Sequence, residues 1–201
     1  MTRVLVVHEA VLFRSALVAL LRAEPGFLVT SVGRRGLADR IRCDRPDVYT
    51  VDVDSPGSVA LLEALELARG GLGQEGALLV LANADRPGTL RKAFDAGALG
   101  FVDRNAPAGT LAEAIRTVRR GERFVDESLA FGFLQAAEMP LTPRELTVLS
   151  LAAEGRSVAD IAQSLCLSRG TVRNYMAAAT RKVGARNRMD AIRISQGAGW
   201  M

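Results

Sequence analysis

The strongest constraint on the fold is a change of hydrophobic pattern near residue 141. Over the first 120 residues, short apolar runs alternate with longer segments of helical periodicity. This alternation predicts a parallel β-sheet covered by helices on both faces. From Leu141 onward only helical segments follow. We therefore expect an α/β domain at residues 1–120 and an all-α domain at residues 141–201.

The α/β part is expected to contain five strands, and two of them, at residues 4–7 and 78–81, are continuously apolar, as buried central strands are. The expected strands are residues 3–7, 27–32, 47–53, 77–82 and 99–102. The expected helices are residues 10–23, 34–43, 58–70, 86–97 and 108–120. Residues 121–140 form the connection to the second part, and the apolar content of residues 124–137 indicates a short helix there.

The all-α part carries start and stop signals for four helices. Thr142, followed by Pro143 and Glu145, predicts a capping box. The other signals are the N-cap candidates Ser157, Ser168 and Asn187 and the stop glycines Gly155 and Gly184. The expected helices are residues 143–154, 158–165, 169–183 and 187–196. A tight turn at residues 166–168 between a short and a longer helix is the layout of a helix-turn-helix, whose second helix enters the DNA major groove.

The positive charge lies in the small C-terminal part. Residues 1–139 hold 17 Lys and Arg against 18 Asp and Glu, whereas residues 140–201 hold 9 against 4. A local net charge of +5 is typical of a domain that meets nucleic acid.

Neither a membrane segment nor a signal peptide is predicted. No apolar run reaches the 18 or so residues that a membrane span needs, and His8 and Glu9 interrupt the first one. Cys43 and Cys166 lie far apart in segments expected to be helical, where a free cysteine behaves as a small hydrophobe. These features predict a reduced, cytoplasmic protein.

Five linked segments identify the helix-turn-helix more closely. They are Leu-Thr-Pro-Arg-Glu at 141–145, Ala-Glu-Gly-Arg-Ser at 153–157, Asp-Ile-Ala at 160–162, Leu-Ser-Arg-Gly-Thr-Val-Arg at 167–173 and Arg-Lys-Val-Gly at 181–184. Together they resemble the LuxR-type domain of the NarL/FixJ family of response regulators. The resemblance implies double-stranded DNA as the partner. Because a single helix-turn-helix touches too little DNA for a specific site, we expect a dimer on an inverted repeat. The expected contacts between copies involve the last helix, near residues 187–196, with helices of the α/β part as an additional candidate.

The resemblance also assigns roles on the second helix of the motif. Arg173 and Asn174 take base-reading positions, because Arg can bond guanine and Asn can bond adenine through two atoms each. Thr171 and Lys182 take positions that contact the DNA backbone. Ala177 is shorter than the usual residue, so its contact is reduced to a thymine methyl or lost. The full expected DNA-binding set is Ser168, Arg169, Thr171, Arg173, Asn174, Ala177, Arg181 and Lys182.

The α/β part is similar to the receiver domain of response regulators, which has a flavodoxin-like fold with its site at the carboxyl ends of the strands. The segments that carry this resemblance are residues 4–9, 12–14, 45–48, 52–57 and 96–101. The resemblance places Asp52 at the phosphoacceptor position, and makes Phe101 either a switch residue or a plain core residue. The implied receiver pocket consists of His8, Glu9, Asp52, Ala82, Phe101 and Arg104.

Several pocket positions depart from receiver chemistry. His8 and Glu9 stand where two acids are usual, Ala82 lacks the hydroxyl that holds the phosphoryl group, and Arg104 replaces a lysine whose compact ammonium it does not reproduce. Glu9 and Asp52 remain the candidate Mg²⁺ ligands. Asp52 is thus either an ordinary structural acid or a genuine phosphoacceptor. We predict an atypical receiver that is gated by a ligand near Arg104, by a partner or by protein level; a sensor kinase stays an open question.

A conventional phosphorylation-gated response regulator is the main alternative, and a protein-interaction adaptor without DNA binding is another. A nucleotide- or flavin-dependent enzyme is disfavoured because the Gly-x-Gly-x-x-Gly spelling at residues 71–76 follows a helix and precedes a strand, the reverse of a dinucleotide site. No catalytic residues are predicted.

Overall fold

The computed structural model describes residues 1–55, 62, 64–65, 76–137 and 139–201. The chain divides into two compact units, one of residues 1–84 and 89–133 and one of residues 85–88 and 134–201. The helix expected at residues 58–70 and the glycine-rich spelling at residues 71–76 lie largely outside the described residues.

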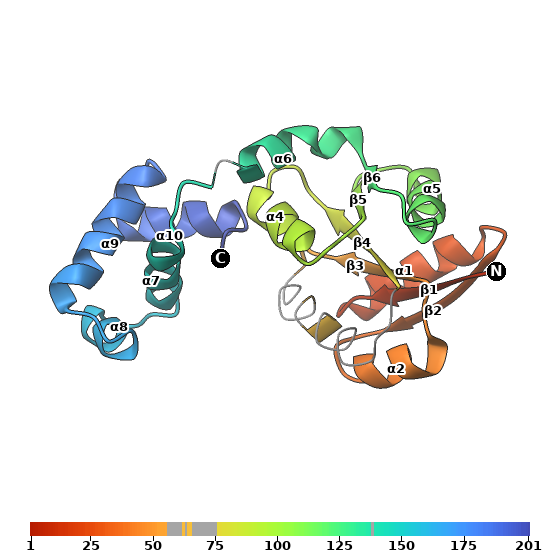
Figure 1. Cartoon of the computed structure of the whole chain (residues 1–201), viewed down its shortest axis with the longest axis horizontal. Coiled ribbons are helices and arrows are strands. Elements are labelled where there is room, and N and C mark those ends of the chain that lie inside the picture. The colour runs from red at the N-terminus through yellow and green to blue at the C-terminus, as the bar shows by residue number, and fades with distance from the viewer. Residues whose placement is uncertain (56–61, 63, 66–75, 138) are drawn as a thin grey trace. The chain divides into compact units, whose positions relative to one another are not determined.

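A parallel sheet forms the centre of the first unit (Figure 1). Its strands are β1 (Thr2–Val7), β2 (Phe27–Val32), β3 (Val48–Asp52), β4 (Ala77–Ala82), β5 (Gly100–Asp103) and β6 (Phe124–Val125). The order in the described part of the chain is β2-β1-β3-β4-β5-β6, and every neighbouring pair is parallel. The five expected strands are therefore confirmed. The sixth, β6, was not expected, because two residues are too short to show a strand's alternation.

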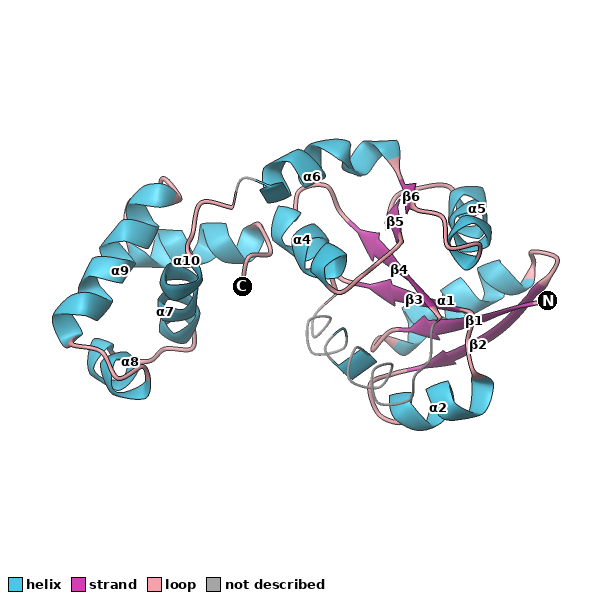
Figure 2. Ribbon diagram, in the orientation of Figure 1, coloured by secondary structure: helices cyan, strands magenta, loops and turns pink. Residues whose placement is uncertain are grey.

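Helices cover both faces of this sheet (Figure 2). They are α1 (Val11–Arg22), α2 (Leu37–Asp44), α4 (Pro87–Asp95) and α5 (Ala108–Arg119). Side chains of a strand point alternately to opposite faces, so β1 sends Val4 and Val6 into the core under α1 and α5. It sends Leu5 and Val7 into the core under α2 and α4.

The connection after α5 carries β6, the short 3₁₀ turn Glu127–Leu129 and helix α6 (Ala130–Ala137). Leu129 is fully buried, and Phe133 packs against the core that lies under α2 and α4. The start of α6, up to Phe133, is thus packed as part of the first unit.

The second unit is helical, with α7 (Pro143–Ala153), α8 (Val158–Ser164), α9 (Arg169–Lys182) and α10 (Arg188–Gly197). The expected caps form at all four starts: the side chains of Thr142, Ser157, Ser168 and Asn187 each accept a backbone N–H from the third residue after the cap. The stop glycines Gly155 and Gly184 have φ of 84° and 69°, a left-handed conformation that glycine adopts without a steric penalty. Val148, Leu149, Ile161, Val172 and Ala191 form the centre of the core.

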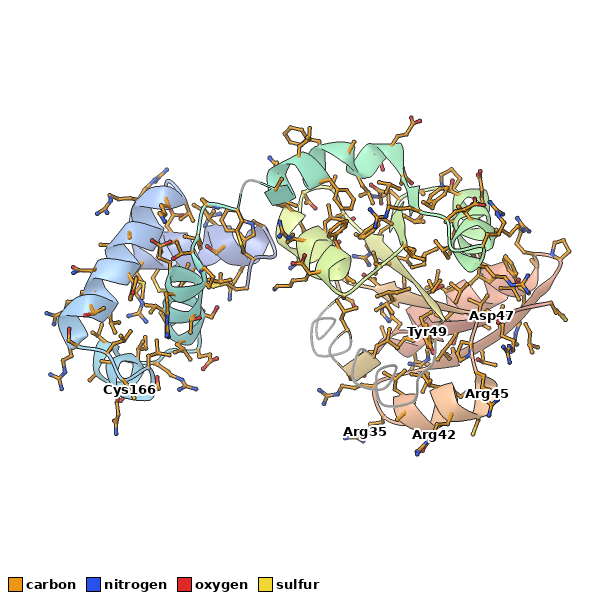
Figure 3. The ribbon with its side chains drawn as sticks, viewed as in Figure 1. Arg35, Arg42, Arg45, Asp47, Tyr49 and Cys166 are labelled. Carbon is orange, nitrogen blue, oxygen red and sulfur yellow. The ribbon has the colours of Figure 1, made fainter. Side chains whose placement is uncertain are left out.

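Both cysteines are free, as expected, but both are exposed, so the expectation that they behave as small hydrophobes was wrong. Cys43 lies two residues after buried Ile41 and so takes the opposite side of α2. Cys166 lies in the turn between α8 and α9, outside either helix, with φ of 54° (Figure 3). Within the described part of the chain, no helix is long and apolar enough to cross a membrane.

Candidate functional sites

The side chain of Asp52 lies at the end of β3, where one oxygen accepts a hydrogen bond and the other lies at ion-pair distance from two basic side chains. It is 1% exposed. One carboxylate oxygen, Oδ2, lies 3.2 Å from Nη2 of Arg104 and 3.3 Å from Nε2 of His8. The other, Oδ1, accepts a hydrogen bond of 2.9 Å from the backbone N–H of Asp54. The carboxyl ends of parallel strands meet at one edge of a sheet, which is why residues following β1 and β5 reach the end of β3.

The ring of Phe13 supports the two basic partners of Asp52. The ring centroids of His8 and Phe13 are 4.6 Å apart, and the guanidinium carbon of Arg104 lies 5.6 Å from the Phe13 centroid. In addition, Nδ1 of His8 accepts the backbone N–H of Ala10 at 2.9 Å. In neutral His8 the proton therefore sits on Nε2, the nitrogen that faces Asp52.

Arg104 reaches Asp52 across the end of β4. Strand β4 lies between β3 and β5, and its last residue, Ala82, accepts the backbone N–H of Arg104 at 3.0 Å. Ala82 is fully buried and carries only a methyl group at this position.

The residues around Asp52 are a poor ligand set for Mg²⁺, which prefers several oxygen ligands. His8 offers nitrogen, and the Arg104 guanidinium already places a positive charge on Asp52. The carboxylate of Glu9 accepts the backbone N–H of Arg34 at 2.6 Å. Among the described residues, no three His, Cys, Asp or Glu side chains gather as a metal site.

A buried polar cluster that the sequence did not indicate lies beside Asp52. Asp54, 8% exposed, accepts the hydroxyl of Thr89 at 2.8 Å through Oδ1 and the backbone N–H of Asn83 through Oδ2. The cluster joins the loop after β3 to the loop after β4 and to the first turn of α4. The acid two residues after Asp52 was visible in the sequence, but nothing local identifies Thr89 as its partner.

Phe101, on β5, is fully buried in the core under α2 and α4. Its ring meets that of Phe133, on α6, edge to face, with centroids 4.9 Å apart and planes at 83°. The sequence did not indicate this second aromatic residue.

The recognition helix α9 separates a core face from an exposed face. Val172 and Ala179 are buried, with Met176 and Val183 packed beside them. Ser168 caps the helix by accepting the backbone N–H of Thr171 at 3.0 Å. The predicted DNA-binding residues that are exposed are Ser168, Arg169, Arg173, Asn174, Ala177, Arg181 and Lys182, while Thr171 is half-buried.

An ion pair ties α9 to α7. Nζ of Lys182 lies 2.8 Å from Oε2 of Glu145, whose carboxylate also accepts the backbone N–H of Thr142. The hydrogen bond from the Lys182 ammonium, aided by the one from Thr142, lowers the pKa of Glu145 below its usual value. Glu145 therefore joins two helices in addition to its predicted capping role. The ammonium of Lys182 is already paired with Glu145 in the free protein.

A parallel α/β unit with an aspartate at the end of its third strand, followed by a helix-turn-helix unit, defines a class: response regulators that act on DNA. The luxR family of bacterial regulatory proteins (GerE) matches residues 139–195. Over the whole chain, the sequence is 52% identical to the response regulator RamR of Streptomyces coelicolor, covering 98% of that protein. It is 34% identical, again over the whole chain, to the transcriptional regulatory protein DesR of Bacillus subtilis, covering 99% of it. The chain belongs to the LuxR family of DNA-binding transcriptional response regulators and is not an enzyme.

Solved structures agree on the fold. RcsB from Salmonella enterica serovar Typhimurium, bound to the promoter P1flhDC in the presence of phosphomimetic BeF3⁻, matches with a TM-score of 0.67. The two sequences are 20% identical, and the match covers 98% of both chains. The response regulator ChrA of a heme-sensing two-component system matches with a TM-score of 0.56 at 24% identity, covering 99% of this chain and 98% of ChrA.

Proposed function

We propose that this chain is a transcription regulator that binds a specific DNA site as a dimer and is gated without phosphorylation of Asp52. The observation that carries the proposal is the contact of Arg104 with the Asp52 carboxylate at 3.2 Å. A receiver needs that carboxylate as a nucleophile, with a metal ion beside it to neutralise the phosphoryl oxygens. Here a side chain of the protein itself supplies the neutralising charge.

Three positions that differ from the usual receiver residues, His8, Ala82 and Arg104, together support this proposal. Arg104 reaches Asp52 over Ala82, the position that would otherwise carry the phosphoryl-binding hydroxyl, and His8 meets the same Asp52 oxygen from the other side. Together they place a guanidinium and an imidazole beside the Asp52 carboxylate, where a receiver would hold a metal ion and a phosphoryl group. Asp52 is then a structural acid that positions Arg104 and His8.

The DNA-binding half of the proposal rests on the exposed face of α9. Arg173 and Asn174 are both exposed there, free of the core that holds Val172. Dimeric binding is supported by α10, where the apolar side chain of Met189 is 70% exposed. A related structure shows two RcsB dimers bound to two parallel DNAs. A regulator of this kind would act in the cytoplasm.

A conventional phosphorylation-gated regulator is the second candidate. In its favour, Asp52 ends β3 as a phosphoacceptor would, and relatives carry the name response regulator. A sensor kinase would then be the partner. Under the first proposal the signal is instead protein level, another protein or a small anionic ligand attracted by Arg104.

The deciding experiment measures DNA affinity of the full chain before and after treatment with a small phosphodonor and Mg²⁺. The matched control is Asp52→Asn, which removes the charge while keeping the size of the side chain. We expect little phosphoprotein, and we expect nearly equal DNA affinity for untreated, treated and Asp52→Asn protein. Stoichiometric labelling of Asp52 that raises affinity tenfold, about 1.4 kcal/mol, would establish the conventional regulator instead.

A further inference from the structure

The buried cluster of Asp54 and Thr89 lies between the Asp52 pocket and α6, the helix in the connection after α5. We propose that this cluster couples the Asp52 loop to the packing site of α6, with Asp54 as the positioning residue. This site, called the seat of α6 below, is where Gly132 packs against Ala84 and Leu90. The coupling uses the hydroxyl of Thr89 on α4, and needs no hydroxyl at position 82. This coupling joins segments of the first unit, and it does not depend on which signal acts at Asp52.

The first link fixes the loop after β3. The backbone N–H of Asp54 donates to Oδ1 of Asp52, the oxygen not contacted by Arg104. The position of Asp54 therefore follows from the orientation of the Asp52 carboxylate. Any change at Asp52 that rotates its carboxylate also moves this hydrogen bond.

The second link passes from Asp54 to α4 and to the loop before it. The carboxylate of Asp54 accepts a hydrogen bond of 2.8 Å from the hydroxyl of Thr89, in the first turn of α4. It also accepts the backbone N–H of Asn83. Thr89 is 4% exposed and Asp54 8% exposed. Hydrogen bonds between groups removed from water are directional and costly to leave unmade, so movement of Asp54 is transmitted to both segments.

The third link is a close fit between this region and α6. A Cβ built on Gly132 would lie 2.6 Å from the carbonyl oxygen of Ala84 and 2.7 Å from Cδ1 of Leu90. Ala84 directly follows Asn83, and Leu90 directly follows Thr89, so Gly132 rests on the neighbours of the two groups that Asp54 holds. A seat with no space for a methyl group is sensitive to shifts of a few tenths of an ångström.

The aromatic pair beside Gly132 also joins α6 to the sheet. Phe133 meets the buried ring of Phe101 edge to face at 4.9 Å, so α6 and β5 are joined on the same face of the sheet. Phe101 is thereby held inward by α6. If the seat of Gly132 changes, the contact between Phe133 and Phe101 changes with it.

The test compares Thr89→Val with Thr89→Ser in the full chain. Valine replaces the hydroxyl by a methyl group at nearly constant size, whereas serine keeps the hydroxyl. The readout is amide hydrogen exchange at residues 129–133, with exchange in β1 as a reference for global unfolding. We expect Thr89→Val to speed exchange at 129–133 by about tenfold, within the range that substitutions in coupled networks produce, and Thr89→Ser to stay near wild type.

A second variant distinguishes coupling from local damage. Gly132→Ala forces α6 off its seat directly, so adding Thr89→Val to it should change exchange at 129–133 little further. A combined effect equal to the product of the two single effects would overturn the proposal, because independent sites behave additively in free energy. Equal effects of Thr89→Val and Thr89→Ser would also overturn it, as would faster exchange in β1 to the same degree as at 129–133.

Discussion

At the scale of single residues, the pocket and the recognition helix use arginine in opposite ways. Arg104 is paired with Asp52 and lies over the Phe13 ring, so its charge is engaged by other groups of the protein. Arg173 is exposed on α9. Its planar fork of donors remains available for a base edge, which is the use that the family resemblance implies.

Replacing Arg173 by alanine tests that use. We expect Arg173→Ala to weaken binding to the specific site by about 1–3 kcal/mol and to relax base preference, because a bidentate contact with guanine is of that size. Titration of fluorescent specific and nonspecific duplexes at fixed salt measures both effects. Arg42→Ala, in α2, is the matched control for loss of one positive charge. Equal affinities for Arg173→Ala and Arg42→Ala on both duplexes would show that the assigned helix register is wrong.

At the scale of elements, the helices of the second unit begin at local capping signals, and an ion pair joins two of these helices. Thr142 and Glu145 form a reciprocal capping box at α7. The same Glu145 then bonds Lys182 at the end of α9. Local capping and packing between helices therefore share one carboxylate.

This shared carboxylate predicts a pH dependence. The pKa of Glu145 is lowered in the folded state, so its contribution to stability is complete above the unfolded pKa of about 4.3 and is lost as the pH falls through the lower folded value. Since Lys182 is 41% exposed, we expect the contribution of the pair to be below about 1 kcal/mol.

Unfolding by urea at a series of pH values, followed by the fluorescence of Trp200, measures this contribution. Trp200 is the single tryptophan and packs against the core of the second unit. The stability difference between wild type and Lys182→Met should be largest near neutral pH and shrink below about pH 4. A difference that stays constant from pH 7 to pH 3 would refute the role of the pair.

At the scale of the whole molecule, specific binding requires more contacts than one α9 provides. A single helix-turn-helix reads few bases, and paired half-sites about one helical turn, roughly 10 bp, apart are the usual solution. We expect the chain to bind such an inverted repeat as a dimer, with α10 in the contact.

Met189 gives the dimer prediction a direct test. Met189→Glu should weaken binding to the inverted repeat by at least about tenfold, or 1.4 kcal/mol, while binding to one half-site changes little. Met189→Leu is the matched control, because it keeps an apolar side chain of similar size. Footprinting together with sedimentation measures occupancy and stoichiometry. Protection of one lone half-site by a monomer would refute the prediction.

The sequence alone determined the elements whose causes are local. The caps at Thr142, Ser157, Ser168 and Asn187 each join groups three residues apart, so spelling and spacing are enough to predict where α7 to α10 begin. The apolar runs likewise predict five strands, because a buried parallel strand needs a continuous apolar stretch. The family motifs located Asp52 and the exposed face of α9, because each motif is a short segment that can be recognised in the sequence.

Only the tertiary structure decided what surrounds those residues. The hydrogen bond between Asp54 and Thr89 joins residues 35 apart, and the contacts of Phe101 with Phe133 and of Arg104 with Asp52 likewise join residues far apart in sequence. Such contacts depend on the order of the strands and on which face each helix covers. Neighbouring residues carry no record of either, because contacts across a sheet are made by packing the whole unit at once.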